Sequence, residues 1–382
     1  MAWRDGRYGN SVTTFNRSDQ SYMQMALTLA ARGRGKTSPN PMVGAVVVNG
    51  GKVVGRGYHA RAGESHAEVL AIREAGDLNH GATLYVTLEP CCHHGRTPPC
   101  VAAIQQAGLA RVVAAMEDPN PLVRGRGIEE LRKAGIQVDV GCLKGEARRL
   151  NEFFVTFHEQ RRPFVTIKWA MSLCGRTAHD SRESRWITNQ QSREHGHRLR
   201  SQHDGVLVGI GTVLSDDPML NVRLANYHGP QPKRIVIDGD LSIPIRARLL
   251  REREKGEVIL FTTPFAKREM VDYFEQEGCR VIVVPSKRRL INMRLVLDEL
   301  ARMGLMSVLI EGGRQIHTSL LTMGLVDKVV AFIAPKIIGG MQLRAPVEDL
   351  GLPRLENALV LRQVKFQTFG DDVYVEGYLR EI

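Results

Sequence analysis

The chain has 382 residues, and 43% of them are hydrophobic. This length exceeds that of a domain with one ordinary hydrophobic core, so we predict two domains. No apolar run approaches the roughly 20 residues of a membrane span, and the first 19 residues lack the apolar centre of a secretory signal, so we expect a cytoplasmic protein without membrane contact. The net charge of +11 is spread along the chain and aromatic residues make up only 6%, which argues against nucleic acid as a partner.

Residues 1–19 are predicted to form a flexible tail, because they carry charges but no apolar core. A helix follows from about Asp19 to Arg32, where apolar side chains recur at helical spacing. Asn49-Gly50 is a strong hairpin signal. It joins two predicted strands, Val43–Val48 and Lys52–Gly57.

The stretch from Thr87 to Cys100 contains three of the six cysteines and two histidines. Together with His66-Ala67-Glu68 upstream, it approximates the H-x-E and P-C pattern of zinc-dependent nucleobase deaminases. We therefore predict His66, Cys91 and Cys100 as metal ligands, because a catalytic zinc site uses three protein ligands and keeps one position for water. Glu68 would carry the proton of that water to the departing amine.

The spacing of the cysteines leaves alternatives open. The pattern has two residues between its cysteines, whereas eight separate Cys91 from Cys100. The insert contains two histidines and Arg96, and it could bind substrate or supply another ligand. Cys92 competes with Cys91 as the ligand. A closed structural zinc site or a set of buried thiols is a further alternative, although such a site has little use for Glu68.

Strands and helices alternate beyond this motif, which indicates a three-layer α/β domain. The predicted elements are a helix over Cys100–Ala107, a strand over Arg111–Met116, a helix over Gly127–Ala134 and a strand over Ile136–Val140. A polar passage over His158–Pro163 then separates the halves. We place the first domain at residues 20–161 and the second at residues 162–382.

The second half contains two apolar runs that stop at glycines and continue as predicted helices. Asp204–Val208 leads into Gly209-Ile210-Gly211, and Met306–Ile310 leads into Glu311-Gly312-Gly313. Such junctions let backbone amides and the positive helix end approach a phosphate. Neither matches the full dinucleotide fingerprint, so tight turns without a ligand remain an equal alternative.

The N-terminal half resembles the deaminase part of the bifunctional riboflavin-biosynthesis deaminase/reductase family. The resemblance rests on the runs SPNPMVGAVVV, GYH, HAEVLAI, TLEPC with HHGRTPPC, and EDPNP. It implies a cytidine-deaminase-like domain with one Zn²⁺ per chain and a phosphorylated pyrimidine as substrate, 2,5-diamino-6-(5-phosphoribosylamino)pyrimidin-4-one, whose 2-amino group leaves as ammonia. The residues implied to surround this substrate are Asn40, His59, Arg96, Asp118 and Asn120.

The C-terminal half is similar to the reductase part of the same family, a dihydrofolate-reductase-like α/β domain that uses NADPH. This similarity rests on KWAMSLCGRTA, SRWIT, GIGTVLSDDPMLNVR, RIVIDG, LIEGG and APKIIGG. It implies hydride transfer to the ribosyl carbon attached to nitrogen, which gives a ribityl group. The residues implied for NADPH are Ala170, Trp186, Thr212, Asp216, Gly313, Arg314, Gln315, Ile316, His317, Thr318 and Ser319. Those implied for the substrate are Ser184, Arg200, Leu220, Arg223 and Glu311, with the two arginines suited to its phosphate.

The chain departs from the family pattern at Cys174, where aspartate is usual in S-L-D-G. Cys92 replaces a common serine and Ser65 a common proline, and neither change removes a proposed ligand. We predict a bifunctional enzyme that catalyses two consecutive steps of riboflavin synthesis as a homo-oligomer, either a dimer or a tetramer. One alternative is a deaminase whose reductase domain is impaired by Cys174. Another is a nucleic-acid-binding or editing protein on the deaminase fold, which the diffuse charge argues against.

Overall fold

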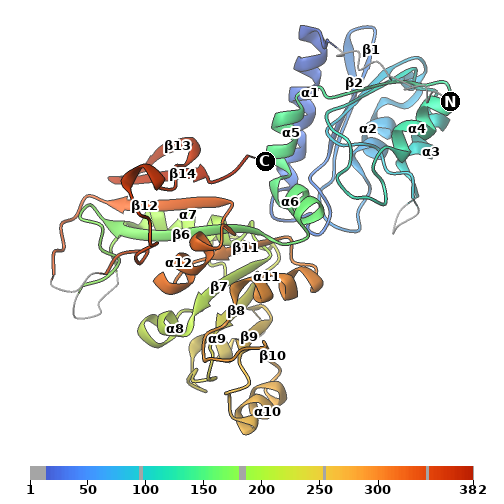
Figure 1. Cartoon of the computed structure of the whole chain (residues 1–382). Coiled ribbons are helices and arrows are strands. Elements are labelled where there is room, and N and C mark those ends of the chain that lie inside the picture. Colours follow the sequence, from blue (N-terminus) through green and yellow to red (C-terminus); the bar gives the residue numbers. More distant parts are fainter. Residues whose placement is uncertain (1–13, 94–97, 180–185, 253–254, 341–343, 382) are drawn as a thin grey trace, which may run out of the picture. The chain divides into compact units, whose positions relative to one another are not determined.

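The computed structural model describes residues 14–93, 98–179, 186–252, 255–340 and 344–381. The chain forms two compact units, Met1–Val155 and Thr156–Ile382, and each has its own sheet (Figure 1). The division falls within a helix, a few residues before the predicted boundary at 161 and 162. Among the residues described, no helix combines the length and the hydropathy that a membrane span needs.

The N-terminal unit is built on a five-stranded sheet with the order β2-β1-β3-β4-β5. β1 pairs antiparallel with β2 and β3, and β3, β4 and β5 are parallel. Gly50 and Gly51 form the turn between β1 and β2 with positive φ, which confirms the hairpin predicted from Asn49-Gly50. The strands are β1 (Gly44–Asn49), β2 (Lys52–Tyr58), β3 (Thr83–Val86), β4 (Arg111–Ala114) and β5 (Gln137–Val140).

Helices on this sheet bury an apolar core of alanine, valine, leucine and isoleucine side chains. The helices are α1 (Arg17–Ala30), α2 (Ala67–Ala75), α3 (Cys100–Gln106), α4 (Arg126–Lys133) and α5 (Lys144–Leu150), with short 3₁₀ turns at Ala31–Gly33 and Gly76–Asn79, and α6 (Glu152–Gln160) spans the division between the units. The helices predicted over Cys100–Ala107 and Gly127–Ala134 are thus confirmed as α3 and α4. This unit has the layered α/β architecture that the alternation of elements predicts.

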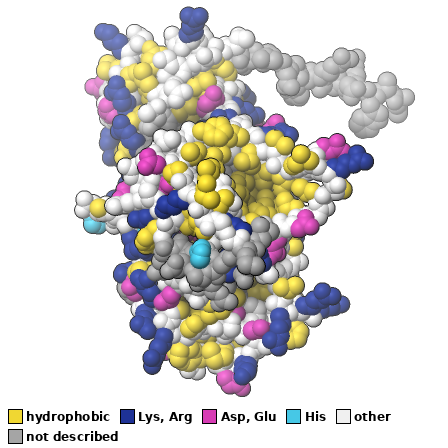
Figure 2. All heavy atoms as spheres, turned by 90° about the vertical axis from the view of Figure 1, so that its left-hand side faces the viewer, with side chains coloured by type: hydrophobic (Ala, Val, Ile, Leu, Met, Phe, Trp, Pro, Cys, Tyr) yellow, Lys and Arg dark blue, Asp and Glu magenta, His cyan; other side chains and the backbone are white. Residues whose placement is uncertain are grey.

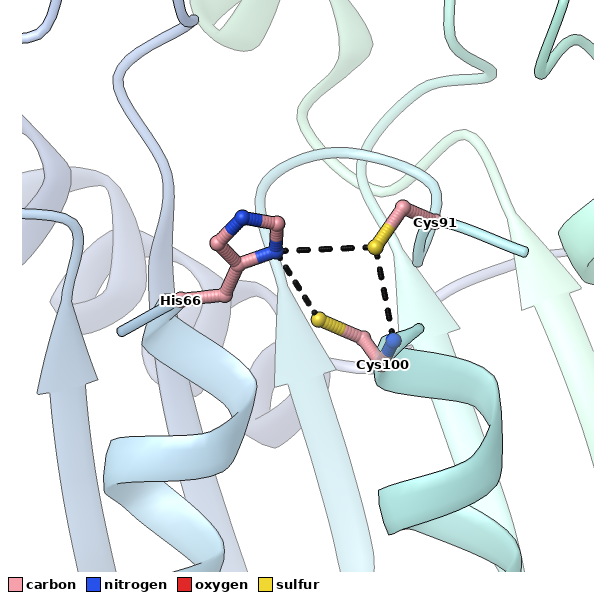
Figure 3. A group of neighbouring side chains, drawn as sticks. All are labelled: His66, Cys91 and Cys100. Atoms are coloured by element: carbon pink, nitrogen blue, oxygen red, sulfur yellow. Dashed lines mark hydrogen bonds between the residues drawn. The ribbon is translucent and has the colours of Figure 1, made fainter. Parts of the chain in front are cut away.

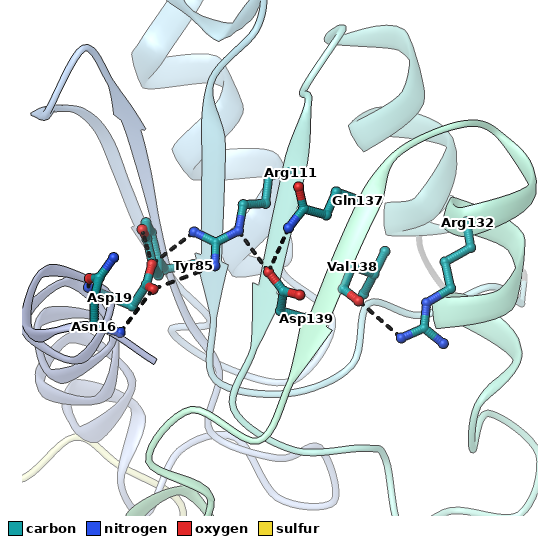
Figure 4. A network of polar contacts seen from close by, with 8 residues as sticks. All are labelled: Asn16, Asp19, Tyr85, Arg111, Arg132, Gln137, Val138 and Asp139. Atoms are coloured by element: carbon teal, nitrogen blue, oxygen red, sulfur yellow. Dashed lines mark hydrogen bonds and ion pairs between the residues drawn. The ribbon is translucent and has the colours of Figure 1, made fainter. Parts of the chain in front are cut away.

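The first helix begins at Arg17, so it takes in the last three residues of the predicted tail. Asn16 and Asp19 form a reciprocal capping box, which satisfies free backbone amides at the helix start. Asp19 is buried and accepts hydrogen bonds from Tyr85 and Arg111 (Figure 4). Burial alone would raise the pKa of Asp19, but these hydrogen bonds and the Arg111 charge lower it. The network therefore ties α1 to β3 and β4.

The C-terminal unit is built on a nine-stranded sheet with the order β10-β9-β8-β7-β11-β6-β12-β14-β13. Neighbouring strands are parallel from β10 to β12, whereas β14 and β13 are antiparallel to their neighbours. The strands are β6 (Phe164–Ser172), β7 (Gly205–Gly209), β8 (Lys233–Ile237), β9 (Val258–Thr262), β10 (Arg280–Val283), β11 (Ser307–Ile310), β12 (Lys328–Ala334), β13 (Arg362–Phe369) and β14 (Asp372–Tyr378).

The helices of this unit follow its parallel strands. They are α7 (Gln190–Arg200), α8 (Ile210–Asp216), α9 (Arg248–Arg251), α10 (Arg268–Gln276), α11 (Met293–Arg302) and α12 (Arg314–Thr322), with a 3₁₀ turn at Leu355–Asn357. The apolar runs predicted before the two glycine turns are confirmed as β7 and β11. Because β6, β7 and β11 are parallel neighbours, their carboxyl ends meet at one edge of the sheet, where ligands of open α/β sheets bind.

β13 is the last strand of the nine-stranded sheet, and its outer edge has no neighbouring strand among the described residues. Phe366 on β13 is 73% exposed, and Leu355 and Val360, in the segment before it, are 92% and 74% exposed. Figure 2 views the side on which β13 and β14 lie in Figure 1, and it shows apolar side chains gathered at the surface.

Candidate active sites

The three predicted metal ligands lie together in the N-terminal unit (Figure 3). The ligand atoms of His66, Cys91 and Cys100 all lie within 4.8 Å of one another. His66 Nδ1 is 3.1 Å from Cys100 Sγ and 3.5 Å from Cys91 Sγ. One nitrogen and two sulfur donors at this separation match an open catalytic zinc site with a fourth position for water.

Local structure explains how these ligands meet. His66 is the N-cap residue of α2, Cys100 is the first residue of α3, and Cys91 lies in the loop after β3. The backbone N–H of Cys100 donates to Cys91 Sγ at 3.3 Å. Hydrogen bonding from Cys100, and then from His66, lowers the pKa of Cys91, which favours the thiolate form of this sulfur. Thiolate is the form that binds zinc.

Glu68 lies in the first turn of α2 and is only 3% exposed. Within the described part of the chain its Oε2 atom is buried and has no hydrogen-bond partner. Burial raises the pKa of Glu68, and the nearby charge of Cys91 raises it further. A buried carboxyl group with a free oxygen beside the ligand group has the properties of a proton carrier.

The competing cysteine has a different environment. Cys92 is partly buried and packs against the apolar core, and it is absent from the group of neighbouring ligand atoms in the described residues. Burial raises the pKa of Cys92, which disfavours the thiolate. Arg96 and its neighbours at positions 94–97 lie outside the described residues.

Four of the five residues predicted to surround the pyrimidine are described, and they fall into two pairs. Asn40 Nδ2 lies 3.1 Å from His59 Nε2, and the buried His59 ring packs edge-on against His66 at 5.5 Å between centroids. Asp118 is also buried, and its Oδ1 atom accepts the backbone N–H of Asn120 at 2.8 Å. Burial raises the pKa of Asp118 to about 7. His59 of the first pair therefore packs against a metal ligand, and Asn40 contacts His59.

The C-terminal unit contains a buried ion pair between α7 and the end of β11. Arg200 Nε and Nη2 donate to the two carboxylate oxygens of Glu311 at 2.6 and 2.7 Å, and its Nη1 donates to the Asn221 carbonyl. The two side chains are 14% and 8% exposed. Burial alone would raise the pKa of Glu311, but the charge and hydrogen bonds of Arg200 lower it to about 2. The three guanidinium nitrogens of Arg200 therefore already donate hydrogen bonds to Glu311 and Asn221.

Lys168 on β6 was not predicted from the sequence. It interacts electrostatically with Glu311 and Arg200, and its Nζ atom lies 5.6 Å from the centre of the Phe332 ring. Burial lowers the pKa of Lys168. The sequence did contain a signal for this residue, namely a lysine inside the apolar run before Cys174. Because lysine is seldom buried without a partner, its position indicates an ion pair or a functional role.

The other predicted substrate residues lie near this ion pair or outside the described residues. Arg223 Nη1 donates to the Asn221 side chain at 2.7 Å, so both arginines contact the same asparagine. Leu220 is buried with φ of +55°, a strained conformation for a leucine. Ser184 lies outside the described residues.

Two of the predicted NADPH residues, Thr212 and Gly313, lie where α8 and α12 begin, after β7 and β11. A Cβ atom at Gly312 would lie 2.6 Å from Thr212 Oγ1, so the turns after β7 and β11 are in close contact. Gly313 has φ of +90° and precedes α12. Within this helix start the side chains of Ile316 and His317 are buried, Ile316 in the core and His317 against the Pro346 carbonyl, so these two side chains are not available to a ligand.

The remaining predicted NADPH residues occupy the surrounding elements. Ala170 lies on β6 and Asp216 ends α8. The ring of Trp186 is stacked by the Arg193 guanidinium at 4.4 Å, and its carbonyl accepts from Lys336. The other predicted residues of the helix start, Arg314, Gln315, Thr318 and Ser319, all lie in α12, and Arg314 forms an ion pair with Glu348.

Cys174 lies in the turn after β6, where it contacts polar groups. Its sulfur lies 3.2 Å from Ser172 Oγ and accepts the backbone N–H of Ile338 at 3.3 Å. These hydrogen bonds, with one from the Gly339 amide, lower the pKa of Cys174 to about 7. A partly ionised thiol thus accepts hydrogen bonds as an aspartate at this position would.

Both halves of the chain match known families and solved structures. The cytidine and deoxycytidylate deaminase zinc-binding region matches residues 16–116, and the RibD C-terminal domain matches residues 163–375. Riboflavin biosynthesis protein RibD of Aquifex aeolicus is 44% identical over 94% of this chain and 97% of its own length. The Escherichia coli protein of the same name is 41% identical over 93% and 98%.

The solved structures agree with these relatives. Acinetobacter baumannii RibD has a TM-score of 0.85 at 36% identity, and the match covers 95% of this chain and 99% of that one. A Thermotoga maritima protein described as a diaminohydroxyphosphoribosylaminopyrimidine deaminase and 5-amino-6-(5-phosphoribosylamino)uracil reductase has a TM-score of 0.79 at 34% identity, with 94% and 98% covered.

Proposed function

Because the chain belongs to the RibD family of riboflavin biosynthesis proteins, it is a bifunctional deaminase and reductase, and we propose which residues carry each reaction. Its first unit is a cytidine-deaminase-like domain that uses Zn²⁺, and its second is a reductase domain that uses NADPH. The proposed substrate is the diaminopyrimidine ribotide. The first unit deaminates it, and the second unit reduces the ribosyl group of the deaminated product. The comparisons do not favour the alternative of a deaminase whose second domain lacks reductase activity.

We propose that deamination occurs beside His66, Cys91 and Cys100. When bound there, zinc supplies a hydroxide nucleophile near neutral pH. Glu68 would take the proton of the attacking water and pass it to the leaving amine. The single observation that carries this assignment is the ligand triad with the unpaired oxygen of buried Glu68 beside it. Asn40, His59, Asp118 and Asn120, with Arg96, would orient the pyrimidine ribotide.

We propose that reduction occurs at the carboxyl edge of the second sheet, where bound NADPH supplies a hydride. Backbone groups of Gly313 and the start of α12 would hold its phosphates, with Thr212, Asp216, Ala170 and Trp186 around the remainder. The Glu311 carboxylate, fixed by Arg200, would orient the ribosyl group. Lys168 would hold a proton near the ring oxygen of the sugar, because its lowered pKa favours proton exchange. Arg223, Leu220 and Ser184 would complete the substrate contacts.

A coupled assay tests both activities and the importance of Cys174. The purified chain receives the diaminopyrimidine ribotide with and without NADPH, and ammonia and NADPH are followed together. We expect ammonia release followed by matching NADPH oxidation, and a similar rate, within about threefold, for Cys174→Asp, since the thiol already accepts the Ile338 amide. Ammonia without NADPH oxidation in the wild type, restored in the variant, would mean that Cys174 impairs the reductase.

We further propose that the chain forms a homodimer, or a tetramer built from such dimers, through β13. Among the described residues no strand pairs with the outer edge of β13, and such an edge with exposed apolar side chains favours pairing with a second copy. In sedimentation velocity the wild type should be a dimer or larger, and Phe366→Glu should shift it towards the monomer. A monomeric wild type would contradict this proposal.

We also propose a cytoplasmic location. None of the six cysteines, all of which lie in the described part of the chain, forms a disulfide bond, as expected in a reducing compartment. Recovery of the protein in a periplasmic or secreted fraction would contradict this assignment.

A further inference from the structure

Glu89 is a buried carboxylate whose partners are backbone amides. It follows β3, lies two residues before Cys91, and is 3% exposed. In the described part of the chain no lysine or arginine forms an ion pair with it. Its oxygens instead accept four backbone N–H groups: from Asp118 at 3.1 Å, Gly125 at 2.9 Å, Gly127 at 3.0 Å and Ile128 at 3.3 Å.

These four donors lie at the two ends of one loop segment, residues 117–128, which comprises most of the connection from β4 to α4 and the first residues of α4. Asp118 lies at the start of the loop, and the other three lie at the beginning of α4. Within the loop, Asp118 Oδ1 accepts from Asn120, and Asn120 Oδ1 accepts from Leu122. Glu89 therefore closes the loop that contains the two predicted substrate residues.

The loop also lies against the chain that leads to the metal ligand. A Cβ atom at Gly127 would be 2.1 Å from the Pro90 carbonyl oxygen and 3.4 Å from Glu89 Oε1. The backbone N–H of Glu89 donates to the Met116 carbonyl at 3.0 Å, just before the loop begins. Glu89 and Pro90, the two residues before the metal ligand Cys91, thus contact both ends of the loop.

We propose that Glu89 is a positioning residue that holds Asp118 and Asn120 in register with the metal ligands, and thereby sets the affinity of the deaminase for its pyrimidine. The proposal rests on the proposed function, in which these two residues contact the substrate. A misplacement of about 1 Å can cost about 100-fold in rate, so a rigid anchor is functionally important here. Backbone donors suit this purpose because they move only when the loop itself moves.

Glu89→Gln tests the proposal with little change in size. Glutamine retains one oxygen, which can accept two of the four N–H groups, and places its own NH₂ group against the other two. We expect the KM for the diaminopyrimidine ribotide to rise about 10- to 100-fold while kcat falls less. Zinc content should stay at one per chain. Backbone hydrogen exchange should accelerate at Asp118, Gly125, Gly127 and Ile128.

Two further variants separate positioning from general destabilisation. Asp19→Asn makes the same acid-to-amide change at another buried carboxylate of this unit, one that contacts Tyr85 and Arg111 rather than the loop, and it should leave the KM unchanged. Gly127→Ala leaves the Glu89 carboxylate intact but pushes the loop from Pro90, and it should reproduce the rise in KM. NADPH oxidation with the already deaminated ribotide provides an internal reference in every variant.

The remaining outcomes overturn the proposal. Loss of zinc from Glu89→Gln would mean that Glu89 supports the metal site rather than the loop. Faster exchange at the four amides with an unchanged KM would reduce its role to stability. If even the wild type releases no ammonia, the proposed function fails, whereas normal exchange at these amides in Glu89→Gln would refute the anchor independently of any activity.

Discussion

Glu68→Gln should lower ammonia release by about 100- to 10,000-fold while the protein keeps its zinc. Glutamine fills the same space as glutamate but cannot take up and release a proton. The ligands His66, Cys91 and Cys100 are unchanged, and their donor atoms already lie within 4.8 Å of one another. Ammonia release and metal content, measured on the same preparation, test the prediction. NADPH oxidation with the deaminated ribotide should remain at the wild-type rate.

The control for this experiment is a ligand variant. Cys91→Ser should lose both zinc and ammonia release, because it removes a thiolate from the metal group. Stoichiometric zinc in Cys91→Ser would direct attention to Cys92. Near-normal ammonia release from zinc-loaded Glu68→Gln would show that another group carries the proton.

The sequence was most informative where function depends on residue types at short spacing. A histidine, a glutamate two residues later and a cysteine after a strand have few uses other than a metal site, so the triad could be predicted before its geometry was known. The hairpin at Asn49-Gly50 was equally local, since its turn needs positive φ. The start of α1 was predicted two residues too late, because Asp19 serves as the N3 residue of a capping box whose N-cap is Asn16.

Residues whose partners are distant in sequence could not be predicted in this way. Arg111 pairs with Asp19 from 92 positions away. Glu89 gives a weaker signal still, because its partners are main-chain N–H groups, which every residue except proline carries. The helix start at residues 313–319 was predicted as a set, yet Ile316 and His317 point into the protein. Family resemblance identifies a segment, whereas packing decides which of its side chains are available.

Arg200→Met should abolish NADPH oxidation and destabilise the C-terminal unit by about 3–5 kcal/mol, which is the cost of breaking a buried ion pair. The substitution leaves Glu311 buried without the two charged hydrogen bonds at 2.6 and 2.7 Å. Arg223→Met is the matched control. Arg223 contacts the Asn221 side chain but forms no ion pair in the described residues, so its loss should raise the KM of the phosphorylated substrate with little change in stability.

The pH dependence of unfolding separates this ion pair from simple packing. Arg200 holds the pKa of Glu311 at about 2, below its ordinary value of 4.5. The pair therefore contributes fully to stability above pH 4.5, and this contribution is lost as the pH falls towards 2. In Arg200→Met the unpaired, buried Glu311 is stabilised by protonation, so the difference in unfolding free energy between wild type and variant should shrink from pH 7 to pH 3. Urea unfolding followed by tryptophan fluorescence measures it, because Trp169 and Trp186 both lie in this unit. A difference that stays constant with pH would mean that Arg200 stabilises the unit by packing and that another group orients Glu311.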